Sequence, residues 1–467
     1  MFDALDESAL LDTMRQAHHR ERVAIAARIL AAGRLALRRI EAAATDNREQ
    51  WCIDNWELVA AEVGAELGIS RNRASSQMQT GLDLIERLPQ LAVLFAAGEV
   101  ELHVVRVALH RTGLITDDDA LASIDRRIVA NAPKWNTLSR NKISDIIDWF
   151  VRDLDPDGVR NERHADDDRH VDVGPGKDGL SQLWGSVRTP DAALFSRRLD
   201  QLAATVCSDD PRTMRQRRAD ALAALASGAS TMRCGCGSND CAVKPTSSPD
   251  TGHIVIHLLA EAATVSGEGN AAGFLPGFGA VPADVVQSLA ARARLRPVIG
   301  GSELQAEPGY RPSQALADFV RCRDLTCRFP GCDRPAEVAD IDHTVPYPLG
   351  PTHPSNLKLL CRAHHLLKTF YGSPGGWADR QMPDGTVIWT SPNGRTYTTK
   401  PAGALFFPQL SAPTEELTLP TAPPEQQPGR ELMMPTRRRT RVQDRAARVQ
   451  WERNRNQARA AADPPPF

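Results

Sequence analysis

Two pairs of metal-capable side chains in the last third of the chain constrain its fold more than any other feature. The first pair is Cys327 and Cys332, and the second pair is Cys361 and His364. A tetrahedral zinc site needs four sulfur or nitrogen ligands, and two short segments that each carry a pair can supply them. The segment 333–360 then has to fold back on itself. This spacing predicts a β-hairpin that closes onto a helix, with zinc joining the base of the hairpin to the start of the helix.

The same stretch holds polar residues that a purely structural zinc site does not need. Hydrolysis of a phosphodiester requires a base that deprotonates water and a cation that stabilises charge on the phosphate. His343 can act as the base, because imidazole titrates near neutral pH. Asp342 and His365 offer a carboxylate and an imidazole to one divalent ion, Mg²⁺ or Mn²⁺, whose other positions hold water and phosphate oxygens. A structural zinc site in a binding module stays open as the alternative interpretation.

Two further residues support this arrangement. Asn356 would fix the loop that carries the candidate base through a side-chain hydrogen bond. Lys368 lies one helical turn beyond His364 and could contact a phosphate. We assign His364 to zinc, rather than its neighbour His365, because it keeps a two-residue spacing from Cys361.

Nine residues of this stretch resemble the motif of the HNH (ββα-metal) endonuclease superfamily: Cys327, Cys332, Asp342, His343, Asn356, Cys361, His364, His365 and Lys368. On that pattern His343 is the first H, Asn356 is the N and His365 is the final H. The resemblance implies a single-metal nuclease fold whose members nick or cut DNA and leave 5′-phosphate and 3′-hydroxyl ends. In this chain four residues separate the first two cysteines, where two are commoner, and His364 stands where many relatives have cysteine.

A wider resemblance covers most of residues 1–400. The stretch Gly309–Cys332, the Ala-Asp-Ala run that follows Arg218 and the helical N-terminus are similar to the actinobacterial thirteen-E-twelve repeat family. This likeness implies a helical domain of unknown function that is paired with a C-terminal HNH module.

The whole sequence predicts a mainly α protein with small α+β parts. Apolar residues recur every three or four positions through the first 155 residues, which is typical of amphipathic helices, and Asp155-Pro-Asp-Gly marks a boundary. We expect a helical domain, a mixed α+β central region with a cysteine loop, a zinc-stapled ββα module of the HNH kind, and a disordered tail that is Pro-rich and then Arg-rich; their ranges are 1–155, 156–310, 311–400 and 401–467.

A helix–turn–helix is predicted over Glu57–Leu88. Gly68 suits the turn, and Ser70 is a good N-cap for the second helix. Arg71 and Arg73 at the start of that helix could enter a major groove, although helical pairs with glycine turns more often serve only for packing.

The tail carries a local excess of positive charge. Residues 430–467 contain ten arginines against four acids. Disordered arginine runs attract phosphates by releasing counterions from nucleic acid. The candidate nucleic-acid contacts in this tail are Arg437, Arg438, Arg439 and Arg441. A solubilising tail is the alternative.

A second cysteine group is incomplete in the sequence. Cys234, Cys236 and Cys241 lie close together and offer three ligands, whereas zinc needs four. The fourth ligand would have to be Cys207, His253 or His257. The alternative is a loop with free thiols.

Composition narrows the class of protein. The net charge of −2 indicates no basic surface over the whole chain, and no apolar run approaches the roughly 18 residues of a membrane span. No charged-then-apolar leader opens the sequence. We expect a cytoplasmic protein without a membrane partner. It would act on DNA, and the helical domain would serve for DNA engagement, targeting or self-association. The alternatives are a non-catalytic DNA-binding or assembly protein that retains the fold, and a secreted toxin nuclease.

Overall fold

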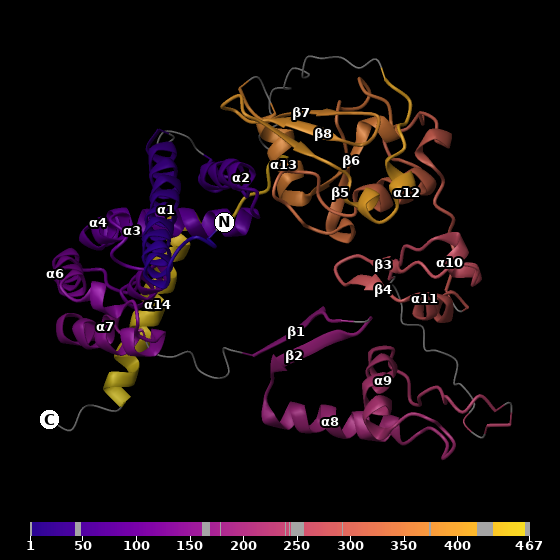
Figure 1. Ribbon diagram of the computed structural model, residues 1–467, viewed down its shortest axis with the longest axis horizontal. Coiled ribbons are helices and arrows are strands. Elements are labelled where there is room, and N and C mark those ends of the chain that lie inside the picture. The colour runs from indigo at the N-terminus through magenta and orange to yellow at the C-terminus, as the bar shows by residue number, and fades with distance from the viewer. Residues whose placement is uncertain are drawn as a thin grey trace. The chain divides into compact units, whose positions relative to one another are not determined.

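The computed structural model describes residues 2–42, 48–160, 169–177, 179–238, 240–241, 243, 256–291, 293–372, 375–417 and 433–462. The chain divides into two compact units. Met1–Asn161 and Pro297–Phe467 form the first unit, and Glu162–Arg296 form the second. The segments that the sequence separates as a helical domain, a metal-binding module and a tail therefore lie together in the first unit. As predicted, the fold is mainly helical with small antiparallel sheets (Figure 1).

Seven helices build the N-terminal part of the first unit: α1 (Glu7–Ala42), α2 (Asn55–Leu67), α3 (Arg71–Arg87), α4 (Pro89–Ala96), α5 (Leu102–Arg111), α6 (Asp118–Val129) and α7 (Arg140–Leu154). The long helix α1 packs closely on α3 because both carry a glycine at the contact. A Cβ on Gly33 would lie 2.3 Å from the carbonyl carbon of Gly81. Side chains at these two positions would push the helices apart.

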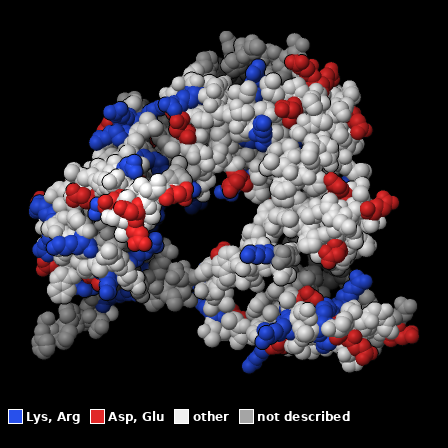
Figure 2. Space-filling model, viewed as in Figure 1, with Lys and Arg blue, Asp and Glu red and all other residues white. Residues whose placement is uncertain are grey.

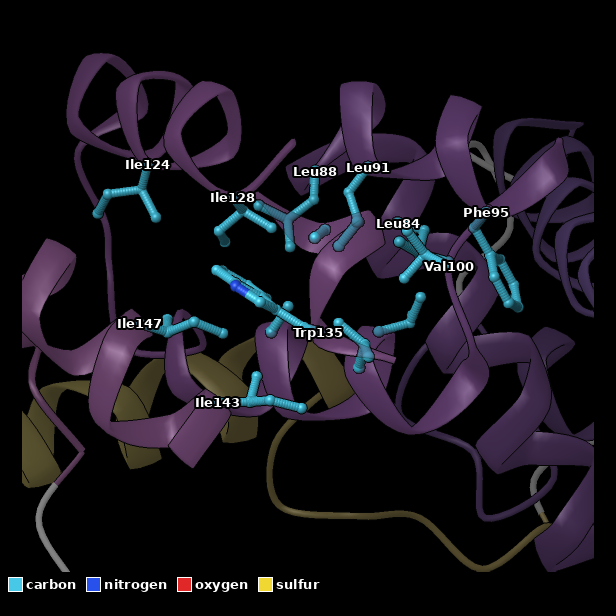
Figure 3. Close-up of a cluster of buried hydrophobic side chains, with 14 of the residues drawn as sticks. Leu84, Leu88, Leu91, Phe95, Val100, Ile124, Ile128, Trp135, Ile143 and Ile147 are labelled. Atoms are coloured by element: carbon cyan, nitrogen blue, oxygen red, sulfur yellow. The ribbon is translucent and has the colours of Figure 1, made fainter. Parts of the chain in front are cut away.

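The apolar core of this helical part is formed by α4, α5, α6 and α7 together with the C-terminal end of α3. Figure 3 shows the side chain of Trp135 between Leu88 and Ile128 on one side and Ile143 and Ile147 on the other. These five side chains are almost completely buried. Their burial removes apolar surface from water and is the main stabilisation of the helices around them.

The predicted helix–turn–helix forms between α2 and α3. Gly68 ends α2 with φ at 61°, the left-handed conformation that glycine adopts without strain. The Ser70 side chain accepts a hydrogen bond from the Arg73 amide and caps α3. Arg71, which the sequence offers to a DNA groove, pairs with Glu57 of α2 instead.

The region 311–400 of the first unit contains two α-helices, a hairpin and a small sheet. Its elements are α12 (Gln314–Asp324), β5 (Ala339–His343), β6 (Leu357–Cys361), α13 (Arg362–Tyr371), β7 (Ala378–Gln381), β8 (Val387–Thr390) and β9 (Thr396–Thr399). Strand β5 pairs antiparallel with β6, with His343 opposite Leu357 and Ala339 opposite Cys361. This is the hairpin followed by a helix that the ligand spacing predicts. The sheet β7-β8-β9 was not predicted.

A buried ion network joins α12 to β6. The Arg323 Nε donates to Asp324 Oδ1 over 2.8 Å, and Arg328 Nη1 donates to the same oxygen over 2.9 Å. The amide of Leu359 donates to the other oxygen of Asp324. Burial alone would raise the pKa of Asp324, but the two guanidinium charges outweigh it and hold that pKa below its ordinary value.

The expectation of a disordered tail over 401–467 is wrong in two described parts. Residues 401–417 contain the short helices η7 (Ala402–Leu405) and η8 (Pro408–Ser411) with Phe407 and Leu410 buried, and α14 (Arg441–Ala462) is a long helix. No residue of α14 is buried, so polar contacts hold it on the helical part. Arg453 pairs with Asp155, and Arg445 pairs with Asp83. The composition of the tail favoured disorder. It gives no sign of these acidic partners, because they lie hundreds of residues away in the sequence. Most of the Pro-rich stretch, 418–432, lies outside the described residues.

The second unit contains short elements around a small core. They are β1 (His170–Pro175), β2 (Ser181–Ser186), α8 (Thr189–Ala203), α9 (Met214–Ala226), α10 (Ala262–Ser266), β3 (Gly273–Leu275), β4 (Gly279–Val281) and α11 (Ala283–Ala290). The alternating residues of His170–Val173 and Leu180–Val187 predict a hairpin, and β1 and β2 form it. The apolar run 253–259 predicts a strand. Residues 253–255 lie outside the described part, and the rest contributes only an isolated bridge between Leu259 and Phe274.

Candidate functional site

Cys327, Cys332, Cys361 and His364 come together in the first unit, as the spacing requires. One ligand atom from each lies within 4.8 Å of all the others, and such a group could hold a metal ion such as zinc. The Nδ1 of His364 lies 3.4 Å from the Cys327 sulfur and 3.3 Å from the Cys361 sulfur. Three thiols and one imidazole are a donor set that zinc accepts. Burial raises the pKa of the Cys327 thiol, so a bound cation is what would favour its thiolate.

Local structure places each of these four side chains. Gly331 takes a φ of 74° in the turn between the first two cysteines. Cys361 ends β6 and is the N-cap of α13, which puts His364 in the first helical turn. The Phe329 ring stacks on the His364 ring at 4.0 Å, and it holds that imidazole toward the thiols.

A second polar cluster lies beside this centre, where β5 faces α13. Oδ1 of Asp342 is 3.5 Å from Nε2 of His365. The other ring nitrogen of His365 lies 2.8 Å from Asp340 Oδ2. A carboxylate at one nitrogen of a histidine orients the ring and leaves the other nitrogen to a metal. Sequence reasoning missed Asp340, although its position two residues before Asp342 places both on one face of the strand.

The second oxygen of Asp342 accepts hydrogen bonds from two lysines. Nζ of Lys358 lies 2.8 Å from Oδ2 and Nζ of Lys368 lies 2.6 Å from it. Asp379 on β7 pairs with Lys358 at 2.6 Å. Burial alone would raise the pKa of Asp342, but the lysine charges hold that pKa well below its ordinary value. Lys368 thus makes internal contacts with Asp342 and with the carbonyl oxygen of His343, and its expected contact with a phosphate stays a prediction.

Lys358 and Asp379 are further residues that sequence reasoning missed. Lys358 sits in an apolar strand sequence, Leu-Lys-Leu-Leu-Cys, and faces Asp342 directly across the hairpin. A lysine in such a strand needs an acidic partner when it is buried, and this was the available signal. Nothing in the sequence indicates that Asp379 is a partner of this lysine, because Asp379 lies on β7, beyond the end of the motif.

His343 ends β5 and is 6% exposed. Its Nε2 lies 2.8 Å from the Thr352 hydroxyl, and that hydroxyl donates to the carbonyl oxygen of Gly309 over 2.5 Å. A hydroxyl has one proton to donate, so it accepts from Nε2 of His343 and leaves Nδ1 as the basic nitrogen. The ring of Tyr310 stacks on the imidazole at 5.3 Å. Burial lowers the pKa of His343, which favours the neutral form that can accept a proton.

Asn356 fixes the loop that follows His343. Its side-chain oxygen accepts from the Val345 amide over 2.8 Å, and its amide nitrogen donates to the carbonyl oxygens of Val345 and Pro351. Asn356 is completely buried. The loop 345–351 is therefore held at both ends by one side chain.

Comparison with known proteins places the chain in a family. A family model described as a domain of unknown function (DUF222) matches residues 16–324. The chain belongs to the DUF222 family. It is the family of the actinobacterial thirteen-E-twelve repeat proteins that the sequence resembles. The match ends at Asp324, so the DUF222 description does not extend to the cluster around Cys327 and His343.

Relatives of this DUF222 chain extend over both parts. The uncharacterized protein Rv3776 of Mycobacterium tuberculosis (strain ATCC 25618 / H37Rv) is 44% identical over 476 residues, which cover 96% of this chain and 90% of the relative. The uncharacterized protein Rv2100 of the same strain is 42% identical over 504 residues, which cover 99% and 90%. No solved structure matches the chain significantly.

The arginines of the tail are divided between two surroundings. Arg437 and Arg441 both pair with Asp54, at the start of α2 in the DUF222 region. These two of the four expected nucleic-acid contacts are thus engaged within the protein. Arg438 and Arg439 are exposed. On the face in Figure 2, basic and acidic side chains are interspersed.

Among the described residues, no helix combines the length and apolar character of a membrane span.

The second cysteine group acquires its fourth member within the DUF222 region. Cys207 joins Cys234, Cys236 and Cys241, and this group too could hold a metal ion such as zinc. Of the other candidates for the fourth ligand, His257 is exposed and outside the group, and His253 lies outside the described residues.

Proposed function

We propose that this protein is a metal-dependent endonuclease of the HNH kind that hydrolyses phosphodiester bonds in DNA. One observation carries the proposal. Asp342 Oδ1 and His365 Nε2 face each other at 3.5 Å, and His343, whose pKa is lowered by burial, follows Asp342 at the end of β5. A structural zinc site would need none of these three side chains.

Asp342 and His365 would hold one divalent ion, Mg²⁺ or Mn²⁺. The free oxygen of Asp342 and the free nitrogen of His365 are the donors, since Lys358 and Asp340 engage the other atoms of the two side chains. When bound, such an ion stabilises negative charge on the scissile phosphate and on the leaving oxygen. Zinc at the cysteine cluster would fix the start of α13, and with it the position of His365.

The base function falls to Nδ1 of His343. Thr352 accepts the proton of Nε2 and holds the ring in one tautomer, and Tyr310 limits its rotation. Nδ1 is then the atom that takes a proton from the attacking water. Asn356 keeps the loop beside His343 in place, and exposed Arg438 and Arg439 supply charge for attraction to the DNA backbone.

Plasmid cleavage by the purified full-length protein tests the proposal. We expect cutting in Mg²⁺ or Mn²⁺, and we expect His343→Ala to lose roughly 10²- to 10⁴-fold in rate while it keeps its zinc. His257→Ala is the matched control, because that histidine is exposed and lies in the second unit. If His343→Ala cuts as fast as the parent protein, the mechanism is wrong.

A second candidate is a DNA-binding or assembly protein that has lost catalysis. The observation that favours it is the pair of lysines on Asp342, which already neutralises this carboxylate without a metal. Retention of DNA without cleavage in any divalent metal would support this function over the first. Size-exclusion chromatography would test self-association through the helical part.

A further inference from the structure

Four cysteines converge in the second unit, far from the candidate nuclease residues in the sequence. Cys207 follows α8, whereas Cys234, Cys236 and Cys241 lie in the loop after α9. Their four sulfur atoms lie within 4.8 Å of one another. We propose that these cysteines bind a structural zinc ion through four thiolates, and that this ion holds the second unit together around α8 and α9.

The spacing of the sulfurs fits zinc. With Zn–S bonds of about 2.3 Å, a tetrahedral site places its sulfurs roughly 3.8 Å apart. The Cys207 and Cys234 sulfurs are 3.3 Å apart, so the four side chains are close to that arrangement. Four soft thiolates favour zinc over Mg²⁺ or Ca²⁺. An iron–sulfur cluster distributes its thiolates over separate iron atoms and needs a wider group.

Hydrogen bonds outside the cysteines hold the two ligand segments together. The buried carboxylate of Asp210 accepts from the Gly235 amide over 2.7 Å, which joins the turn after Cys207 to the loop that carries Cys234. Arg212 donates to the carbonyl oxygen of Arg233 over 2.8 Å and also pairs with Asp210. The backbone around the site is therefore fixed by contacts that do not involve the thiols.

The apolar core of this region is small. Its cluster of buried side chains consists of Leu199, Leu202, Ala221 and Met232. Segments with so few buried residues usually need a metal or disulfides to fold. Met232 stands two residues before Cys234, and its amide donates to Thr205. Release of the cysteine loop would therefore also open the core.

The cysteine inventory gives this proposal a sharp test. Three of the nine cysteines belong to the cluster with His364 and four to this one, and Cys52 and Cys322 lie in neither. None forms a disulfide in the described structure. Metal analysis of the full-length protein, purified under reducing conditions, should give two zinc ions per chain and no iron.

Variants assign the two ions. Cys234→Ser combined with Cys236→Ser should lower the zinc content from two to one, as should Cys361→Ser at the other cluster. Cys52→Ser should keep both ions. If the double variant does not fold, a Co²⁺ titration of the metal-free parent protein still decides, because two tetrahedral cobalt sites should fill per chain. Two zinc ions in the double variant, or a single zinc in the parent that Cys361→Ser removes and the double variant keeps, would overturn the proposal. Neither result depends on nuclease activity.

Discussion

The two cysteine clusters of this chain have similar ligands but different surroundings. The cluster with His364 lies within an apolar core that also takes in Ile53, from the loop before α2, and Met434, from the C-terminal segment. The cluster with Cys207 lies beside only a few buried side chains. The comparison teaches that the first ion would be added to a structure that packing already supports, whereas the second would replace packing that the region lacks.

Metal removal should separate the two clusters most strongly. With a chelator present, amide exchange in α9 and in the loop 232–238 should speed up by about a hundredfold or more, because few side chains are buried there and only hydrogen bonds such as those of Asp210 and Arg212 remain. Strand β6 and helix α13 should keep most of their protection, since the apolar core around the cluster with His364 still packs on them. Hydrogen-exchange mass spectrometry measures both regions in one sample. Equal loss of protection in both would contradict the comparison.

The region around the cluster with His364 should also lose stability when its buried ion pairs are broken, even if its metal stays bound. Asp324→Asn leaves Arg323 and Arg328 buried beside a neutral partner, which should cost about 3–5 kcal/mol in the free energy of unfolding. Urea denaturation measures this loss. Asp318→Asn is the control, because that acid is only half-buried on the same helix and its hydrogen bond with Gln314 is exposed to solvent, so the change should cost less than about 0.5 kcal/mol.

The carboxylate of Asp324 should make the free energy of unfolding depend on pH. Its pKa in the folded protein lies below the ordinary value of 3.8, because the arginine charges outweigh the effect of burial. The stabilisation is therefore complete above the ordinary pKa and is lost as the pH falls below it. A parent protein that loses no more stability in acid than Asp324→Asn would contradict this assignment.

Substitution of a helix cap should have the smallest effect on stability, and the loss should be similar in both units. Thr213 caps α9 in the second unit through a capping box with Gln216, and Ser139 caps α7 in the first. Replacing either by alanine should cost about 1 kcal/mol, because one amide of the first turn loses its acceptor. Hydrogen exchange of each helix measures the change. The zinc content should stay at two in both variants, so a cap substitution that releases zinc would show that α9 is even less stable than the comparison states.

Local sequence signals predicted the parts of the fold that depend on neighbouring residues. The left-handed Gly68, the Ser70 cap and the hairpin between the ligand pairs all follow from a few adjacent positions. The position of Asn356 against the loop after β5 could also be predicted, because a buried amide beside a turn bonds to its backbone.

Features that depend on distant partners could not be predicted. α14 is held by acids such as Asp155 and Asp83, and nothing near its arginines indicates them. The fourth member of the second cysteine group required knowing that the end of α8 lies beside the loop after α9. The engagement of Lys368 by Asp342 was missed because a lysine one turn along a helix is usually exposed.

The contact between the C-terminal segment and α2 has a consequence for how the chain matures. Thr436 forms a bridge with Trp51, and Arg437 and Arg441 neutralise Asp54 at the head of α2. During synthesis, the ribosome releases Asp54 hundreds of residues before these arginines. Until residue 441 has been made, Asp54 therefore lacks these two cationic partners and keeps only its capping contact with α2, and a nascent chain that stops before residue 433 would leave its carboxylate open to water.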